Sequence, residues 1–442
     1  MPYLSNSESD FRAMLDVIGV KDFEELISNI PEKLRFKRKL KIPSAVSEFE
    51  TRKILEEIAA DNKTYTSFLG GGVYDHYIPA AINSIISRPE FYTSYTPYQP
   101  EVSQGNLQVM YEFQSLICEL TGMDMTNASI YDAGSALGEA VLTAATQTRR
   151  NKILMPETVN WRYKEIAETY SKHLGIEIVS IPHDNFTLDK DELKNNFDES
   201  TAAIVVQHPN YFGFLEDIEN ITALRGSDKA LLIQVYDPIS LGLLKTPGEF
   251  GMDMAVAEGQ VLGNAQNFGG PFLGLFSVTE KLVRKMPGRL AGITKDTEGK
   301  RGFVMTLQTR EQHIRRDKAT SNICTNSGLL TVAASVYLSL LGKKGIQEAA
   351  NLSLQKAHYL ADQLAQINGV TVIPGKHFFK EFTIELPVPA QTVIKKAMEK
   401  GIFAGISLER YGYPNNLLIA VTEKRTIAEI DTYTELLKSI IQ

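Results

Sequence analysis

The sequence is poor in cysteine and has no excess of positive charge. Its 442 residues contain two cysteines, Cys118 and Cys324, which are too far apart to suggest a disulfide framework or a metal site. A formal net charge of -7 argues against a general nucleic-acid-binding protein. Low cysteine usage is typical of a reducing compartment, so we expect a cytoplasmic protein without a bound metal.

Long apolar runs and a secretory leader are also missing. The N-terminal residues are polar and acidic, unlike the charged and apolar regions of a signal peptide. The longest apolar-leaning stretch, residues 329–341, is interrupted by Thr331, Ser335 and Ser339. It is too short and too polar to span a bilayer, so we expect no membrane association.

The apolar pattern divides the chain into three parts. Residues 1–65 predict short helices interrupted at Gly19 and Pro31, an arm rather than a domain. Residues 66–325 alternate between apolar strands and helices, and residues 326–442 predict a smaller α+β domain. Continuous apolar strands separated by helices indicate an α/β fold whose mostly parallel central sheet is covered on both faces.

Ligands of such sheets bind outside the carboxyl ends of the strands, and Asp237 is expected there. It follows a predicted strand at 230–235 and precedes Pro238. In pyridoxal-phosphate enzymes of the aspartate aminotransferase fold, an aspartate in this place pairs with the pyridinium nitrogen and makes the ring a better electron sink. A turn-forming aspartate before proline is the alternative.

A second feature is the small-residue segment 131–140, which opens a predicted helix. Exposed amides at a helix N-terminus bind phosphate, and the hydroxyl of Ser135 would assist. Capping alone also explains a helix that begins with Gly-Ser.

The third feature is a missing lysine. Residues 253–260 predict a strand, followed by the turn Gly269-Gly270-Pro271. In the same fold, a strand in this place delivers the lysine of the Schiff base just before a glycine-rich turn. Gln260 holds that place here, and a primary amide forms no Schiff base. Lys245 and Lys281 do not fit it either.

Five unusual strings resemble the glycine cleavage system P-protein family. They are SFLGGGVYDH (67–76), EFYTSYTPYQPEVSQG (90–105), LTGM (120–123), PGR (287–289) and TLQTREQHIRRDKATSNIC (306–324). The match is to the N-terminal half of that protein, which some organisms make as a separate subunit 1. In that family the lysine belongs to the other half, so the resemblance implies its absence here.

The resemblance implies an aspartate-aminotransferase-like fold (fold type I) and a glycine dehydrogenase (decarboxylating) built from two subunits. Pyridoxal 5'-phosphate would be bound covalently by the lysine-bearing subunit 2, and glycine would be decarboxylated there. The aminomethyl group would pass to the lipoyl arm of H-protein, with T-protein and L-protein completing the system. We expect a heterodimer, and a dimer of such dimers.

Tyr95, Tyr98, Gln99 and Glu101 lie in a segment that Pro97 and Pro100 hold extended. Packing at an interface is a common role for tyrosine. The family resemblance implies instead that this loop reaches the partner's cofactor, because dimers of this fold build each active site from both chains.

Arg310 is a further candidate for the partner's site, since a guanidinium binds phosphate or carboxylate in a bidentate manner. A solvated helix face is the alternative. The candidate cofactor contacts, working or vestigial, are Ser135, Asp237, Thr320 and Asn322.

Two other motifs receive structural interpretations. Gly70-Gly71-Gly72 predicts a tight turn that brings backbone close to the partner subunit, with a phosphate cradle as the alternative. His76 has no paired group in the sequence, so we expect a hydrogen-bonded structural histidine rather than a general base.

Two other classes of function remain open. One is an autonomous pyridoxal-phosphate enzyme, an aminotransferase or decarboxylase, whose lysine is unassigned. The other is a non-catalytic scaffold or regulatory subunit with a degenerate crevice.

Overall fold

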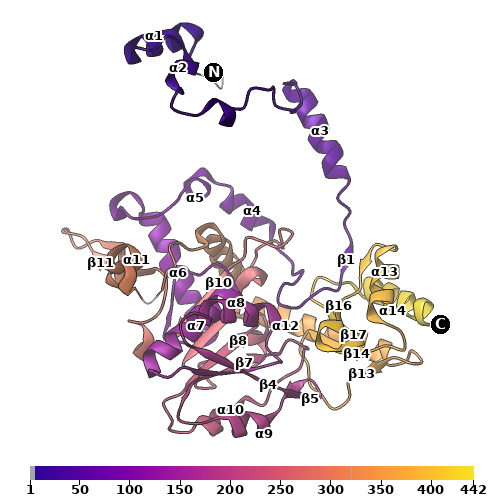
Figure 1. The fold of residues 1–442 in the computed structure, drawn as a ribbon. Coiled ribbons are helices and arrows are strands. Elements are labelled where there is room, and N and C mark those ends of the chain that lie inside the picture. Colours follow the sequence, from indigo (N-terminus) through magenta and orange to yellow (C-terminus); the bar gives the residue numbers. More distant parts are fainter. Residues whose placement is uncertain (1–4, 320) are drawn as a thin grey trace. The chain divides into compact units, whose positions relative to one another are not determined.

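The computed structural model describes residues 5–319 and 321–442 (Figure 1). The chain forms two compact units, Met1–Lys63 and Thr64–Gln442. The first was expected to end at residue 65. The further boundary expected at 325/326 lies inside the second unit and stays a prediction.

The N-terminal unit consists of short helices: α1 (Glu8–Ile18), α2 (Phe23–Leu26), a 3-10 turn (Glu32–Leu34) and α3 (Glu48–Ala60). Ser7 begins α1 with a capping box, and Gly19 ends it in the left-handed conformation. Among residues 5–63, Leu15 alone is buried. The exposed apolar side chains of this unit include Val17, Leu34, Phe36, Leu40, Ile42 and Phe49.

The second unit is built around a seven-stranded sheet of order β2-β10-β9-β8-β7-β3-β4. The strands are β2 (Met125–Thr126), β3 (Lys152–Pro156), β4 (Glu177–Ile181), β7 (Thr201–His208), β8 (Leu231–Tyr236), β9 (Met254–Glu258) and β10 (Gly274–Val278). Strands β9, β8, β7, β3 and β4 run parallel, and β10 is antiparallel to both neighbours. The predicted mostly parallel sheet is confirmed.

Helices cover both faces of this sheet. Alternate residues of a strand point to opposite faces, and β8 shows the two environments. Ile233 and Val235 pack in one apolar cluster with residues of α7 (Ala133–Thr148), whereas Leu232 packs with residues of α10 (Ile218–Arg225). The other helices of the sheet region are α4 (Ala80–Ile86), α5 (Pro89–Tyr92), α6 (Gln104–Thr121), α8 (Trp161–Ser171), α9 (Lys190–Asn196) and α11 (Gln312–Arg315).

One long helix, α12 (Gly328–Leu364), leads to the C-terminal part. The sequence predicted two helices, at 327–341 and 345–367. They join at Gly342, whose backbone is not helical (φ 56°, ψ -171°). By length and composition α12 is apolar enough to cross a membrane. Its first half is buried against the central sheet and its second half against the C-terminal sheet, as in a core helix of a globular protein.

The C-terminal sheet has the order β13-β14-β17-β16. It comprises β13 (Thr371–Val372), β14 (Glu381–Glu385), β16 (Ile406–Leu408) and β17 (Tyr413–Ala420), with helices α13 (Ala390–Met398) and α14 (Ile427–Ile441). A parallel pair, β1 (Thr66–Ser67) with β15 (Ile402–Phe403), joins the beginning of the second unit to this part.

Two hairpins were not predicted from the sequence. They are β5 (His183–Asp184) with β6 (Thr187–Leu188), and β11 (Leu290–Lys295) with β12 (Arg301–Thr306). Figure 1 shows the second hairpin on the far side of the central sheet from the C-terminal strands.

Candidate functional site

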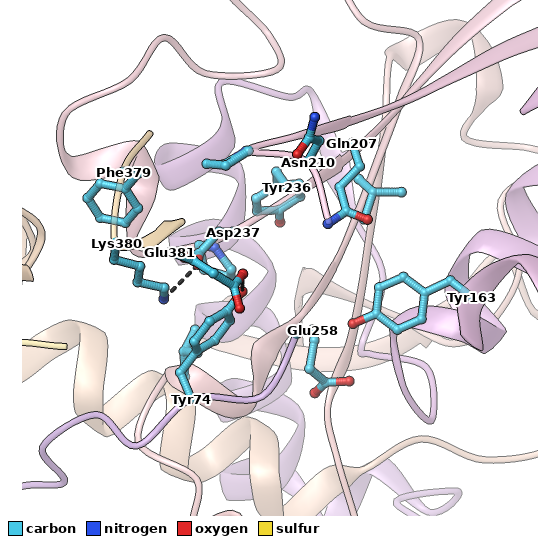
Figure 2. Close-up of a pocket in the computed structure, with 15 residues that line it drawn as sticks. Tyr74, Tyr163, Gln207, Asn210, Tyr236, Asp237, Glu258, Phe379, Lys380 and Glu381 are labelled. Atoms are coloured by element: carbon cyan, nitrogen blue, oxygen red, sulfur yellow. Dashed lines mark hydrogen bonds and ion pairs between the residues drawn. The ribbon is translucent and has the colours of Figure 1, made fainter. Parts of the chain in front are cut away.

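A crevice lies at the carboxyl ends of β7, β8 and β9, where the beginning of β14 meets the central sheet (Figure 2). This is the edge at which an open α/β sheet binds ligands. The side chains that line it include Tyr74, Tyr163, Gln207, Asn210, Asp237, Glu258, Phe379, Lys380 and Glu381.

Asp237 stands at the end of β8, and both of its oxygens are occupied. Oδ1 accepts hydrogen bonds from the amides of Ile239 (2.9 Å) and Ser240 (3.2 Å), as a turn-forming aspartate does. Oδ2 lies 2.6 Å from Nζ of Lys380, whose side chain is almost completely buried. The two interpretations of Asp237 therefore combine, because one oxygen shapes the turn and the other faces a cation in the crevice.

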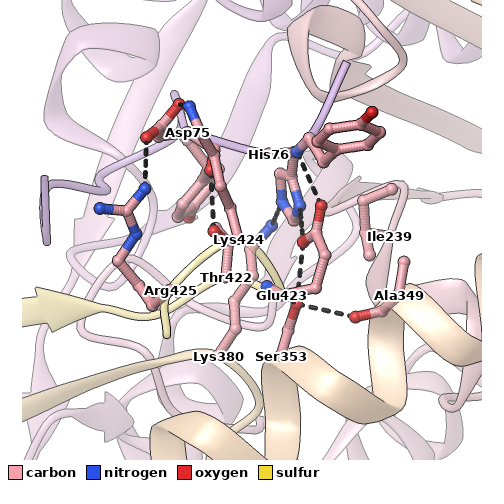
Figure 3. A network of polar contacts seen from close by, with 12 residues as sticks. Asp75, His76, Ile239, Ala349, Ser353, Lys380, Thr422, Glu423, Lys424 and Arg425 are labelled. Carbon is pink, nitrogen blue, oxygen red and sulfur yellow. Dashed lines mark hydrogen bonds and ion pairs between the residues drawn. The ribbon is translucent and has the colours of Figure 1, made fainter. Parts of the chain in front are cut away.

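Lys380 continues into a buried polar chain. Its ammonium donates to Nε2 of His76 (2.8 Å), and Nδ1 of His76 pairs with Oε2 of Glu423 (2.6 Å) (Figure 3). Because Nε2 accepts from an ammonium, the imidazole is neutral and carries its proton on Nδ1. Burial, and then the charge of Lys380, lower the pKa of His76. The expected hydrogen bonds of His76 are present, and its structural role stays a prediction.

Glu423 is the charged end of this hydrogen-bond network. Burial alone would raise the pKa of its carboxyl, but the hydrogen bonds from His76 and from the amide of Tyr77 lower that pKa. Glu423 also accepts from Ser353 Oγ, and its own amide donates back to that hydroxyl (3.0 Å). The network therefore ties the segment after β1 to α12 and to the end of β17.

The glycine-rich turn 70–72 packs against the same region. The amide of Gly71 donates to Oε1 of Glu381 (2.7 Å), and the phenol of Tyr74 donates to Oε2 (2.8 Å). A Cβ at Gly70 would lie 2.0 Å from the Glu381 carboxylate, so only glycine fits. The sequence placed this turn near a partner subunit. The structure places it against the chain's own C-terminal part.

Glu258, the last residue of β9, faces the N-terminus of α7. Its carboxyl accepts hydrogen bonds from three amides, those of Ala133 (3.2 Å), Gln260 (3.0 Å) and Leu273 (2.9 Å). The amide of Ser135, two residues further along the helix, donates to Oδ1 of Asp132 (2.7 Å). Two of the amides that the sequence suggested for a phosphate, those of Ala133 and Ser135, are thus bound by side chains of this chain.

Gln260 lies two residues after the end of β9 and is buried, with 2% of its surface exposed. Its Oε1 accepts from the amide of Tyr74 (3.0 Å), and its Nε2 donates to the carbonyl of Asn264 (2.8 Å). The side chain in the expected lysine position therefore joins two loops and presents no nucleophile.

Pyridoxal phosphate, which this kind of fold implies, does not fit the crevice. The space open to the centre of a water molecule is about 30 Å³, room for about two waters. The carboxylate expected to meet a pyridinium holds Lys380, and the amides expected to meet a phosphate hold Glu258 and Asp132. An amide stands where an amine is required.

A second candidate surface brings together strings that are far apart in sequence. Arg289 is buried and donates to the carbonyl of Cys324 (2.7 Å) and to Oδ1 of Asn326 (3.1 Å). Its guanidinium also meets the ring and the hydroxyl of Tyr98, the latter at 3.5 Å. The PGR string therefore connects the tyrosine segment to the end of the 306–324 string.

The tyrosines on this surface point outward. Tyr95 is 90% exposed and Tyr98 is 54% exposed, and Gln99 and Glu101 are exposed as well. Of the other candidates, Asn322 is exposed and Thr320 lies outside the described residues.

Arg310 points inward instead. It donates to the carbonyls of Leu307, Met286 and Gly288, the last at 2.9 Å, and burial lowers its pKa. In this conformation its guanidinium binds backbone carbonyls of its own chain. Among the described residues, Arg310 makes no hydrogen bond to Tyr95, Tyr98, Gln99 or Glu101, although its partner Gly288 adjoins Arg289, which contacts Tyr98.

Sequence reasoning missed Lys380, Glu381 and Glu423 altogether. A weak signal was present, because Lys380-Glu381 interrupts an apolar run that continues from Phe378 to Ile384. Charged pairs inside a buried strand are rare unless each has a partner. The sequence offered no means of identifying those partners.

The raised pKa of Glu258 leads to a prediction about stability. Burial raises it from 4.5 to about 7, so folding takes up a proton between these values and the wild type loses stability as the pH rises through them. Glu258→Gln removes this titration but turns an N–H toward the Ala133 amide. We expect a lower melting temperature than wild type at about pH 5 and a smaller deficit at about pH 8. A deficit that grows with pH would contradict this.

The sheet and the place of the crevice define a class of fold, that of the fold type I pyridoxal-phosphate enzymes. An alanine–glyoxylate aminotransferase from Nostoc sp. has the same fold, with a TM-score of 0.62 and 16% identity over 93% of this chain and 99% of that one. The sphingosine-1-phosphate lyase of Burkholderia pseudomallei has a TM-score of 0.68 at 14% identity, over 93% and 94%.

The chain belongs to the glycine cleavage system P-protein family, whose model matches residues 1–437. It is 49% identical, over the whole of both chains, to a probable glycine dehydrogenase (decarboxylating) subunit 1 of Chloroherpeton thalassium. It is 51% identical to that of Carboxydothermus hydrogenoformans over 99% of each. A crystal structure of an inhibitor-bound glycine decarboxylase (P-protein) of the glycine cleavage system has a TM-score of 0.92 and 37% identity, covering all of both chains.

Proposed function

We propose that this chain is subunit 1 of a two-subunit glycine dehydrogenase (decarboxylating), and that the second subunit carries the cofactor. The full-length similarity to proteins named as subunit 1 supports the role. The observation that carries the division of labour is Gln260, which holds the place of the lysine and is bound on both sides.

In this proposal, pyridoxal phosphate is bound covalently by subunit 2 and supplies the electron sink for the decarboxylation of glycine. Subunit 1 completes the cleft, excludes water and helps to shape the entrance for the lipoyl arm of H-protein. T-protein and L-protein act on the later intermediates. We place the enzyme in the cytoplasm.

Reconstitution tests the proposal. The chain is co-expressed with its lysine-bearing partner, and glycine–bicarbonate exchange is measured for each subunit alone and for both together. We expect this chain alone to be colourless and inactive, and the pair to be active. Glycine turnover by this chain alone, or a yellow cofactor complex that one of its own lysines maintains, would instead identify an autonomous enzyme.

The N-terminal unit supports a large interface with the partner. Its apolar side chains are exposed, with Phe49 at 79% and Val17 at 89%. An apolar surface of this kind marks an interaction site, and an obligate interface buries more than roughly 2,000 Å².

Removal of residues 1–63 is therefore expected to abolish co-purification with subunit 2, while the remaining unit keeps a cooperative melting transition. Phe49→Ala should weaken the association, and Lys53→Ala on the same helix is the matched control. Unchanged binding after truncation would locate the interface elsewhere.

A further inference from the structure

The two ends of the crevice carry a cation and a hydrogen-bond acceptor in the order that a cofactor of this class would require. Asp237, at the end of β8, faces a cation held 2.6 Å away, the ammonium of Lys380. At the other end, the amides around the start of α7 face an acid, the carboxyl of Glu258. Figure 2 shows Lys380 beside Asp237, with Glu258 on the other side of the pocket near Tyr163.

Each of these groups matches one part of pyridoxal phosphate in chemistry. A protonated ring nitrogen donates to an aspartate, and so does the Lys380 ammonium. A phosphate accepts from amides at a helix N-terminus, and so does Glu258, with the amides of Ala133, Gln260 and Leu273. Between them, space remains for about two waters.

Side chains between the two ends of the crevice also make contacts within the chain. The Lys380 ammonium lies 3.8 Å from the centre of the Tyr74 ring and bonds to His76. Gln260 is bound to the Tyr74 amide and to Asn264. The charged side chains at the two ends of the crevice, and Gln260 in the lysine position, therefore have partners within the chain.

We propose that this crevice contains an internal substitute for the cofactor, in which Lys380 replaces the ring nitrogen and Glu258 replaces the phosphate. The substitute joins the C-terminal part to the central sheet, as a bound cofactor joins the two lobes of a catalytic subunit. The inference deepens the proposed division of labour and rests on it. It predicts that each side chain is replaceable by a small ion of matching charge.

Chemical complementation tests the two ends separately, in the assembled two-subunit enzyme. Lys380→Ala removes the cation, and added methylammonium should raise the melting temperature of this variant by several degrees more than that of wild type. Glu258→Ala opens the α7 amides, and inorganic phosphate should act in the same way on this variant. Sodium chloride at equal ionic strength is the salt control, and Lys376→Met, outside the crevice, controls for loss of a lysine.

A capture experiment tests the whole substitute. Pyridoxal phosphate is added, borohydride fixes any lysine-bound aldehyde as a secondary amine, and the mass of this chain is measured apart from its partner. Gln260→Lys alone should gain no phosphopyridoxyl group, since Lys380 and Glu258 still occupy the positions of the ring nitrogen and the phosphate. Gln260→Lys combined with Lys380→Ala and Glu258→Ala should gain one phosphopyridoxyl group.

The outcomes separate this inference from the proposed function. Absence of rescue by either ion, including variants that stay unfolded in its presence, would overturn the inference. So would stoichiometric labelling of the single Gln260→Lys variant. Labelling of the wild-type chain would overturn the proposed division of labour instead, and the ion experiments would still stand on their own.

Discussion

Replacement of Lys380 by methionine is expected to lower the free energy of unfolding by about 3–5 kcal/mol, the usual cost of leaving a buried charge without its partner. Asp237 would retain a buried carboxylate whose cation is gone, and Nε2 of His76 would lose its donor. Thermal unfolding of the purified chain and of the assembled enzyme measures the effect.

A second change makes this expectation specific. Asp237→Asn keeps the oxygen that accepts the amides of Ile239 and Ser240, but it removes the negative charge. In the Lys380→Met background it should restore part of the lost stability, because the two residues are coupled. Lys376→Met, which loses a bond to Thr187 outside the crevice, should change stability by less than about 1 kcal/mol. Additive losses at 237 and 380 would show that the pair is not coupled.

Removal of the phenol hydroxyls of Tyr95 and Tyr98 is expected to reduce glycine decarboxylation by the assembled enzyme about 10- to 100-fold. A lost hydrogen bond to a charged group costs about 1.5–3 kcal/mol, and we propose that these phenols reach the partner's site. The measurements are kcat and KM for Tyr95→Phe and Tyr98→Phe, with the subunit ratio determined by size-exclusion chromatography.

Tyr92→Phe is the matched control, because Tyr92 is also exposed and lies only a few residues earlier, on α5. It should retain full activity. Dissociation of the Tyr95 or Tyr98 variants would assign these residues to interface packing. Full activity in an intact complex would favour a scaffold role for this surface.

The central sheet was predictable because its strands are continuous apolar runs, which have few alternatives. Strand β7, for example, is buried from Thr201 to Val206. The hairpin of β11 and β12 escaped prediction because its strands are partly exposed and mix charged with apolar residues. Ile293, within β11, is half exposed. Such a pattern resembles a loop until its partner strand is known.

The site was predictable only on the side that local sequence determines. The turn after β8 identifies Asp237, and the glycine-rich turn after β9 identifies Gln260. The group that occupies the crevice could not be inferred from the sequence. Lys380 directly precedes β14 and meets Asp237 only through tertiary packing. The inward direction of Arg310 depends in the same way on carbonyls of the 286–288 segment.

The ion pair of Asp237 and Lys380 also bears on how the enzyme is produced in the cell. Because the contact between the C-terminal part and the central sheet is made by side chains of the chain itself, it can form as soon as the chain leaves the ribosome. In the proposed division of labour, maturation of this half is then independent of vitamin supply, and only its companion waits for the coenzyme. Under B6 starvation, this chain should therefore accumulate in native form, ready to receive its companion when the coenzyme returns.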